Sequence, residues 1–390
     1  MDIHVFAIDS PYNKTFVEFI ARNFNMDDNL FISLCDKTAQ TYPLPERDNI
    51  LHIPTGNFGA HKKIHDFFTQ AKRIFAHSLF EPALNLFATY PGQKKIMLIP
   101  WGSEMAPFIF RDINDRLDDR TRRFFSGDGP LIASRTYSQM AAEWELWRKT
   151  NLVLSKVSHL LHITNFNHQV LKQVFGKDLI PLPFQYYNPV DFSLLDREVK
   201  PANEIYHFKN RFKKVLQLAH SGNPANNHIS IIDKLAELNR DDFCVIAPLS
   251  YGVRDAINRI SDYGEEKLSG RFFPINEFLP PEQYAALLRQ VDTLLINSFY
   301  SGGTANMTLM LHLGRKVMLS SRNISSHAVF KTYGINLPEI KLDDKHDLWL
   351  NDAFKGLDEE TCQHNREQMT KMVSEERLCD MYAYLLSKTE

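Results

Sequence analysis

The chain has 390 residues, enough for two domains of ordinary size, and its 44% hydrophobic and 24% charged content is typical of a globular protein. A formal net charge of −2 argues against nucleic acid as a partner, and the four cysteines lack the C-x-x-C spacing of a zinc site. No apolar run reaches the roughly 18 residues that span a bilayer, and the N-terminus does not resemble a signal peptide, so we expect a cytoplasmic protein.

Short apolar runs in the first half of the chain predict strands that alternate with helices. The strands are expected at 4–8, 30–34, 50–53, 95–99 and 159–163, and helices at 15–23 and 79–89. A further helix is predicted where Ile64, Phe67, Phe68, Ala71, Ile74 and Phe75 recur at helical spacing. The prolines of 181–192 resist both helix and central strand and predict a linker.

The second half repeats the alternation of strand and helix. Strands are expected at 213–219, 243–248, 271–275, 293–298 and 316–320, followed by a charged helical tail from Asp343. Such alternation implies parallel sheets wrapped by helices. We therefore predict an α/β fold of two doubly wound, Rossmann-like domains facing a cleft. The expected domains are 1–195 and 196–340, with a helical segment 341–390 that is a candidate for packing back on the N-terminal domain.

Two strand–turn–helix units in the second half are candidates for binding a diphosphate. The first, 213–238, contains the turn HSGNPANNH, and the second, 293–319, contains YSGGTAN. Free backbone N–H groups and the positive end of a helix favour an anion at such turns. Many α/β proteins carry one such turn without a ligand, but two in one half favour a pyrophosphate. The candidate residues are Ser221, Gly222, Asn223, Asn226 and His228 in the first turn, and Ser301, Gly302, Gly303 and Thr304 in the second.

A third turn of the same predicted sheet follows the strand at 243–248. Ser250, Tyr251 and Gly252 are placed to line the base or sugar of a nucleotide. The alternative is an ordinary turn between a strand and a helix.

Two residues of the first half are candidate bases. Glu104 follows a predicted strand in the sequence WGSEM, where a carboxylate can accept a proton from an attacking hydroxyl. Its alternative is a carboxylate that stabilises a helix N-terminus. His77 is a second candidate for a base or an acceptor ligand, and its alternative is a core histidine.

The Walker A, G-x-G-x-x-G, H-E-x-x-H and G-x-S-x-G signatures are absent, which disfavours kinase, nicotinamide, zinc-protease and serine-hydrolase chemistry.

Four segments together resemble the family 56 glycosyltransferases, which transfer Fuc4NAc from its dTDP form to a lipid-linked precursor of enterobacterial common antigen. The segments are HSLFEPALNLF, WGSEM, SGNPANNH and YAALLRQVD, the last followed by Gly303 and Gly314. The resemblance extends from about residue 75 to 320 at low identity. Glu104 stands where the family has aspartate, and Ala305 where it tends to have a second glycine.

The resemblance implies a GT-B fold and a glycosyltransferase of bacterial surface-glycan synthesis. The C-terminal domain would bind a dTDP- or UDP-sugar, and the N-terminal domain a lipid-linked or polysaccharide acceptor. It implies no cofactor, since the nucleotide-sugar is a substrate, and no metal, since helix ends and side chains neutralise the diphosphate. The alternatives are a GT-B-like sugar-nucleotide epimerase or hydrolase, and a non-enzymatic sugar-nucleotide sensor.

A lipid-linked acceptor would also imply peripheral contact with the cytoplasmic face of the inner membrane. Basic and aromatic residues of the first half are the candidates for that contact: Lys62, Lys63, Arg122, Arg123 and Phe124.

Overall fold

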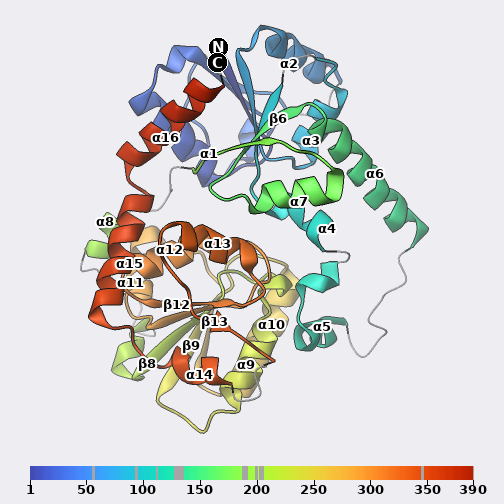
Figure 1. Ribbon diagram of the computed structural model, residues 1–390. Helices are drawn as coiled ribbons and strands as arrows, with labels where there is room; N and C mark the ends of the chain where they lie inside the picture. Colours follow the sequence, from blue (N-terminus) through green and yellow to red (C-terminus); the bar gives the residue numbers. More distant parts are fainter. Residues whose placement is uncertain are drawn as a thin grey trace. The chain divides into compact units, whose positions relative to one another are not determined.

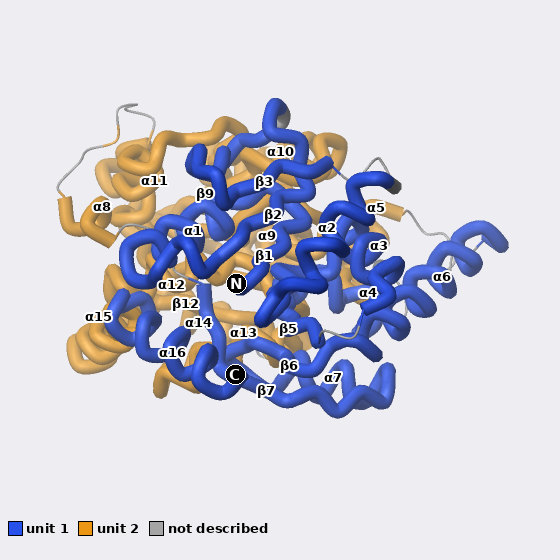
Figure 2. Tube along the Cα trace, turned by 90° about the horizontal axis from the view of Figure 1, so that it is seen from above, with its two compact units in different colours: residues 1–109, 131–189, 373–390 blue, residues 110–130, 190–372 orange. Residues whose placement is uncertain are grey.

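The computed structural model describes residues 1–54, 58–92, 95–110, 113–126, 136–186, 192–197, 201, 206–343 and 347–389. The chain divides into two compact units, which Figure 2 shows in different colours. Unit 1 comprises residues 1–109, 131–189 and 373–390, and unit 2 comprises 110–130 and 190–372.

Unit 1 is built on a seven-stranded parallel sheet with the order β3-β2-β1-β4-β5-β6-β7. The strands are β1 (Asp2–Phe6), β2 (Asn29–Ser33), β3 (Ile50–His52), β4 (Arg73–His77), β5 (Ile96–Ile99), β6 (Val157–Leu161) and β7 (Ile180–Leu182). The helices are α1 (Pro11–Asn23), α2 (Phe58–Gln70), α3 (Glu81–Thr89), α4 (Ala106–Ile109), α6 (Tyr137–Leu154), α7 (Phe166–Phe175) and α16 (Glu375–Lys388). The strand order reverses next to β1, as expected of a doubly wound sheet.

The prediction of one helix from Ile64 to Phe75 is wrong at its end. Helix α2 stops at Gln70, and the following residues form β4, which pairs with both β1 and β5. All five residues of β4 are buried, so the strand lacks the alternation that marks a half-exposed strand. A short, continuous apolar run is compatible with either a buried strand or a buried helix, and here sheet pairing decided.

Unit 2 is built on a six-stranded parallel sheet with the order β10-β9-β8-β11-β12-β13. The strands are β8 (Lys214–Leu218), β9 (Phe243–Pro248), β10 (Phe272–Ile275), β11 (Thr293–Ile296), β12 (Lys316–Ser320) and β13 (Glu339–Ile340). The helices are α5 (Asp119–Ser126), α8 (Ser193–Asp196), α9 (His228–Ala236), α10 (Arg254–Leu268), α11 (Pro281–Leu288), α12 (Thr304–His312), α13 (Ile324–Thr332), α14 (Leu348–Ala353) and α15 (Glu359–Met372) (Figure 1).

The observed units differ from the expected domain boundaries in two places. Residues 110–130 belong to unit 2 although residues of unit 1 precede and follow them. The tail is divided, with 373–390 in unit 1 and the residues before it in unit 2. Contacts between elements that are distant in sequence cause both differences. The sequence marked the helical tail as a candidate for packing back on the N-terminal domain, but it gave no sign of where the tail divides or that 110–130 join unit 2.

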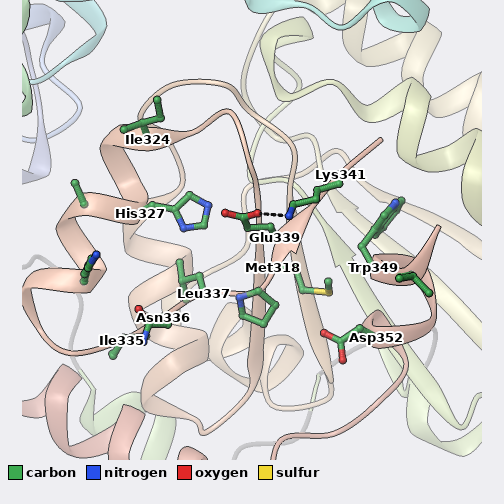
Figure 3. A pocket seen from close by; sticks show the side chains of 14 residues that line it. Met318, Ile324, His327, Ile335, Asn336, Leu337, Glu339, Lys341, Trp349 and Asp352 are labelled. Atoms are coloured by element: carbon green, nitrogen blue, oxygen red, sulfur yellow. Dashed lines mark ion pairs between the residues drawn. The ribbon is translucent and has the colours of Figure 1, made fainter. Parts of the chain in front are cut away.

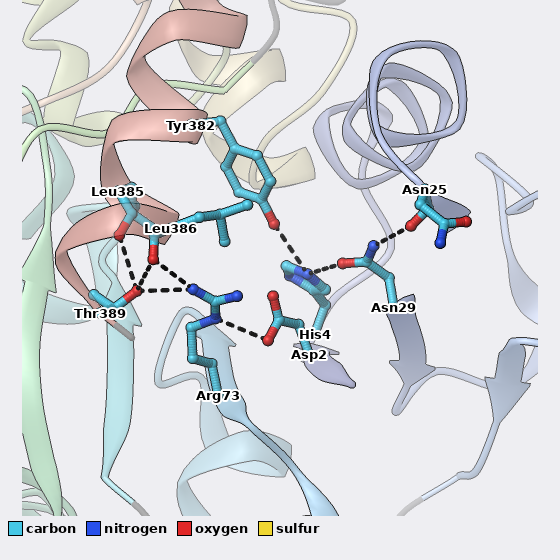
Figure 4. A network of polar contacts seen from close by, with 9 residues as sticks. All are labelled: Asp2, His4, Asn25, Asn29, Arg73, Tyr382, Leu385, Leu386 and Thr389. Atoms are coloured by element: carbon cyan, nitrogen blue, oxygen red, sulfur yellow. Dashed lines mark hydrogen bonds and ion pairs between the residues drawn. The ribbon is translucent and has the colours of Figure 1, made fainter. Parts of the chain in front are cut away.

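Helix α16 is fixed to unit 1 by apolar packing and by a hydrogen bond from Arg73, whose guanidinium also forms a buried ion pair with Asp2. Leu378, Tyr382 and Leu385 belong to the same buried cluster as residues of the first strands. At its C-terminal end, Arg73 Nη1 donates to the carbonyl oxygen of Leu386 at 2.7 Å, while Arg73 Nε lies 2.8 Å from Asp2 Oδ1 (Figure 4). The side chains of Arg73 and Asp2 are both 8% exposed.

We expect Arg73→Met to destabilise the protein by about 3–5 kcal/mol, because it leaves the carboxylate of Asp2 buried without its cation. Unfolding in urea measures this change. The matched control is Arg22→Ala, which removes the exposed ion pair between Arg22 and Glu375 at the other end of α16. We expect the control to cost less than about 1 kcal/mol, since exposed pairs are screened by water. Equal losses in the two variants would contradict the assignment of Arg73 as the buried anchor.

Candidate active site

The first candidate turn follows β8 and is held together by its own side chains. Asn226 donates from Nδ2 to the carbonyl oxygen of Ser221 at 2.8 Å and to its hydroxyl at 2.9 Å. Both residues are at most 3% exposed. Asn223 is exposed and accepts the N–H of Ala225 at 2.9 Å, which makes it a capping residue inside the turn. The turn is therefore rigid before any ligand arrives.

Two glycines bring this turn into direct contact with the turn after β9. Gly222 N–H donates to the carbonyl oxygen of Tyr251 at 2.8 Å, and Gly222 and Gly252 form a parallel bridge. A Cβ on Gly222 would lie 2.2 Å from the Ile257 side chain, and a Cβ on Gly252 would lie 2.7 Å from the backbone of Gly222. Both positions thus need glycine for packing. Ser250 is half-buried and Tyr251 is 53% exposed beside them.

His228, the first residue of α9, is a buried imidazole for which the described part of the chain supplies no partner. It is 1% exposed, and neither of its ring nitrogens has a hydrogen-bond partner among the described residues. Burial, with a smaller contribution from the nearby His220, lowers the pKa of His228 to about 3. The first N–H groups of α9 also lack a side-chain acceptor, since within the described ranges no side chain caps the helix. A buried polar group without a partner costs free energy, which a ligand can recover.

The second candidate turn, after β11, is shaped by a left-handed glycine and a neighbouring histidine. Gly303 has φ of 70° and precedes α12. A Cβ on Gly303 would lie 2.9 Å from Nδ1 of His220, and one on Gly302 3.1 Å from Cε1 of the same ring. His220 thus lies against both turns, and burial lowers its pKa to about 4. The sequence analysis did not select His220, although it begins the HSGNPANNH turn.

Asparagine side chains fix the remaining backbone of the second turn. Asn323 donates from Nδ2 to the carbonyl oxygens of Ser298 at 3.0 Å and Tyr300 at 3.2 Å. Ser301 is exposed, while Gly302, Gly303 and Thr304 are partly exposed. Parallel pairing of β8 with β9 and β11 brings all three predicted turns to the carboxyl edge of one sheet.

In unit 1, Glu104 lies beyond the carboxyl end of β5 and is almost fully buried. Its side chain accepts the N–H of Trp101 at Oε1, 2.8 Å away, while Oε2 has no partner in the described part of the chain. Burial raises the pKa of Glu104 to about 7, although backbone N–H groups, that of Trp101 first, oppose the shift. The carboxyl group therefore changes protonation state near neutral pH, as a general base requires.

His77, at the end of β4, is bonded on both sides within the protein. The Tyr186 hydroxyl accepts the indole N–H of Trp101 at 3.0 Å and lies 2.6 Å from His77 Nδ1, so it donates its proton to that nitrogen. His77 Nε2 then donates to His4 Nδ1 at 3.0 Å. His4 Nε2 in turn donates to Asn29 Oδ1 at 3.1 Å (Figure 4).

The consequence is that His77 has no nitrogen left for a substrate. It is 1% exposed, and burial lowers its pKa well below the usual value for histidine. This environment favours the core-histidine alternative, with His77 orienting the hydroxyl of Tyr186.

Ser78 is a polar residue of this region that the sequence analysis did not select. It follows β4 with φ of 89° and is 0% exposed. Its hydroxyl has no hydrogen-bond partner among the residues that the structure describes. Neither its left-handed backbone nor its burial is visible in the sequence, because serine is common in ordinary turns.

Unit 2 also has a surface hollow whose lining does not include the three turns. It is bounded by α13, β13 and α14, and includes His327, Trp349 and the ion pair of Lys341 with Glu339 at 2.9 Å (Figure 3). Elsewhere, no three His, Cys, Asp or Glu side chains come together as a metal site would require within the described ranges.

Several solved structures share this architecture over nearly the whole chain. Sucrose-phosphate synthase of Thermosynechococcus elongatus matches with a TM-score of 0.66 and 11% identity, over 100% of this chain and 98% of that one. Alr3699/HepE of Anabaena, solved with UDP and glucose, matches with a TM-score of 0.64 and 12% identity, over 99% of each chain. A trehalose-phosphate synthase of Burkholderia xenovorans, solved with glucose-6-phosphate, matches with a TM-score of 0.60 and 9% identity, over 100% of each chain.

These matches confirm the prediction of two Rossmann-like domains in a GT-B fold. No protein-family model matches the chain, and no curated protein sequence does. At identities near 10% the likeness establishes the fold, while the activity has to be argued from the residues of this chain.

Proposed function

We propose that the protein is a glycosyltransferase that moves a sugar from a dTDP- or UDP-sugar to an acceptor in bacterial surface-glycan synthesis. The observation that carries this proposal is the edge of the unit 2 sheet where Gly222 touches Gly252 and His220 lies against Gly302 and Gly303. His228 is buried at the helix start that follows the first of these turns. A buried imidazole without a partner there, at a helix start that no described side chain caps, fits a nucleoside diphosphate. Structural neighbours with bound UDP support a nucleotide-sugar donor.

The proposed reaction assigns one task to each group of residues. The acceptor hydroxyl attacks the anomeric carbon of the donor and loses its proton to Glu104 Oε2, the oxygen without a partner in the described ranges. The bond between that carbon and the diphosphate breaks, and the diphosphate leaves with the electron pair. Backbone N–H groups at the starts of α9 and α12 stabilise the added negative charge. With these donors in place, the proposal needs no metal ion and no cofactor.

The proposed acceptor is lipid-linked, and one surface of unit 1 suits a membrane. Tyr137, Met140 and Trp144 follow one another at helical spacing on α6 and are 85%, 48% and 62% exposed. Tyrosine and tryptophan are enriched where proteins meet the lipid headgroup region. Among the described residues, no helix has the length and apolarity to cross a bilayer.

The basic residues named in the sequence analysis are divided between the two units. Lys62 and Lys63 lie on α2 of unit 1, whereas Arg122, Arg123 and Phe124 lie on α5, which belongs to unit 2. Phe124 packs against Tyr263 there, with a ring-centroid distance of 4.9 Å. The row on α6 therefore replaces them as the proposed contact.

For the donor, we expect His228→Phe to abolish the stabilisation that UDP or dTDP gives the wild-type protein. A ligand present at 100 times its dissociation constant stabilises by about 2.7 kcal/mol, which thermal unfolding detects. The variant without ligand should be at least as stable as the wild type, because a buried polar ring without a partner is replaced by an apolar one. An unchanged ligand shift in the variant would contradict this role of His228. No shift in the wild type with any nucleoside diphosphate would contradict the function itself.

For the chemistry, we expect Glu104→Gln to lower kcat by at least about a hundredfold with donor affinity unchanged, since base assistance is worth about 10²–10⁴. In the wild type, kcat/KM should fall about tenfold per pH unit below pH 7, because protonation removes the base. Transfer of labelled sugar measures both. Glu81→Gln, which removes an exposed carboxylate at the start of α3, is the control and should behave as the wild type. A Gln variant with normal turnover would show that Glu104 has a structural role only.

For the membrane, we expect Trp144→Ala to weaken binding to phosphatidylglycerol vesicles about tenfold. This is the effect of losing one large side chain that becomes buried in the membrane on binding. Co-sedimentation measures the bound fraction. Phe278→Ala removes an aromatic side chain that is 72% exposed in unit 2 and serves as the control. Equal binding by both variants, or none by the wild type, would count against membrane contact through α6.

A further inference from the structure

The segment 113–126 makes a set of buried contacts with the candidate turns that the proposed reaction does not use. It comprises a short 3-10 helix at Ile113–Arg116 and helix α5, and it belongs to unit 2. Residues of unit 1 stand on both sides of it in the sequence. We call it the strap.

The strap contacts both turns through one aspartate. The backbone N–H of Asp118 donates to Asn227 Oδ1 at 2.9 Å, and Asp118 Oδ2 accepts from Asn297 Nδ2 at 3.2 Å. Asn227 ends the first turn, and Asn297 begins the second. Their exposures are 9%, 0% and 1% in the order Asp118, Asn227, Asn297, so water does not compete for these bonds.

The two asparagines are also bonded to each other. Asn227 Nδ2 donates to the carbonyl oxygen of Asn297 at 3.0 Å, and Asn297 Nδ2 to that of Asn227 at 3.3 Å. Asn227 Nδ2 also donates to the carbonyl oxygen of Arg116, in the strap, at 3.1 Å. The three side chains thus form one closed network in which each turn is held relative to the other.

Asn227 connects this network with the proposed ligand contacts. It has a left-handed backbone, with φ of 53° and ψ of 47°, and immediately precedes His228. A displacement of Asn227 therefore changes the direction of the first N–H groups of α9 and the place of the imidazole. Its left-handed conformation is unfavourable for a residue other than glycine and persists where surrounding contacts impose it.

We propose that Asp118 is a positioning residue that holds the first and second candidate turns in the geometry that binds a diphosphate. This inference rests on the proposed function. A direct contact of Asp118 with the ligand is disfavoured, because two negative charges repel each other in a buried place. Its carboxylate is instead occupied by Asn297 and by the N–H of Thr121, 2.8 Å from Oδ1, at the start of α5.

The strap offers a matched control in Arg120. Its guanidinium forms an ion pair with Asp233 of α9 and reaches the Tyr263 hydroxyl of α10, at 3.2 Å from Nη2. These contacts attach the same segment to the same unit, but they involve the bodies of the helices and neither turn. Arg120→Ala thus loosens the strap and leaves Asn227 and Asn297 in place.

The test compares Asp118→Ala, Asp118→Asn and Arg120→Ala by calorimetric titration with UDP and, separately, with dTDP. We expect Asp118→Ala to bind the nucleotide that binds the wild type at least about tenfold more weakly, the effect of losing a buried hydrogen bond to a charged group. Asp118→Asn keeps the shape of the side chain but has a single oxygen, so it cannot accept from both Asn297 and the N–H of Thr121 and should also bind more weakly. The bond from the backbone N–H of residue 118 to Asn227 remains in both variants. Arg120→Ala should stay within about twofold of the wild type. Urea unfolding of every variant gives its loss of stability.

Three outcomes separate the possibilities. Binding by both Asp118 variants at the wild-type level overturns the proposal. The proposal is also overturned if Arg120→Ala loses as much nucleotide affinity as the Asp118 variants at the same loss of unfolding free energy, since Asp118 would then only stabilise the strap. A wild-type protein that binds neither nucleotide instead contradicts the proposed function. If Asp118→Ala does not fold, the isosteric Asp118→Asn decides alone.

Discussion

Parallel pairing of β8 with β9 on one side and β11 on the other brings three loops to one edge of the unit 2 sheet. Every feature of the candidate donor site depends on this pairing, because it brings together loops that are separated by about 30 to 80 residues of sequence. The Gly222–Gly252 bridge continues the β8–β9 pairing beyond the strands, and only glycine allows so close an approach. In unit 1 the same rule places His77 and Glu104 after the adjacent strands β4 and β5.

Polar side chains at these edges fall into two groups. One group donates side-chain amide hydrogens to backbone carbonyl oxygens and so fixes the loops: Asn226, Asn227, Asn297 and Asn323. By contrast, His228, the hydroxyl of Ser78 and Oε2 of Glu104 are buried and find no partner in the described ranges. Buried polar groups are normally hydrogen-bonded, so exceptions beside a rigid frame indicate where a ligand completes the bonding. The structure thus separates residues that fix the loops from buried polar groups that the proposed ligands would bind.

Two segments connect parts of the chain that are distant in sequence. Helix α16 returns to unit 1 and is anchored by Arg73 and Asp2, at the first strand of the protein. The strap 113–126 leaves the unit 1 sequence and docks on α9 and α10 of unit 2. In both segments a few buried hydrogen bonds are joined to a larger apolar contact. Apolar packing supplies most of the free energy of such docking, and the hydrogen bonds fix its register.

The alternation of strand and helix, with turns rich in glycine and asparagine after buried strands, determined the fold class and the three turns of unit 2. These features are local, and the handed connection of parallel strands leaves few topologies for them. The residues SGNPANNH also marked His228, although its burial without a partner could not be known from them.

Only the tertiary structure decided that Ile74 and Phe75 belong to a central strand, that His77 is bonded on both ring nitrogens, and that Asp118 ties the two turns together. Each of these depends on which distant neighbour a residue meets. The sequence of an apolar run, or the identity of a histidine or an aspartate, does not depend on its neighbours in the fold. Burial and pairing with those neighbours then fix the conformation, the protonation and the role.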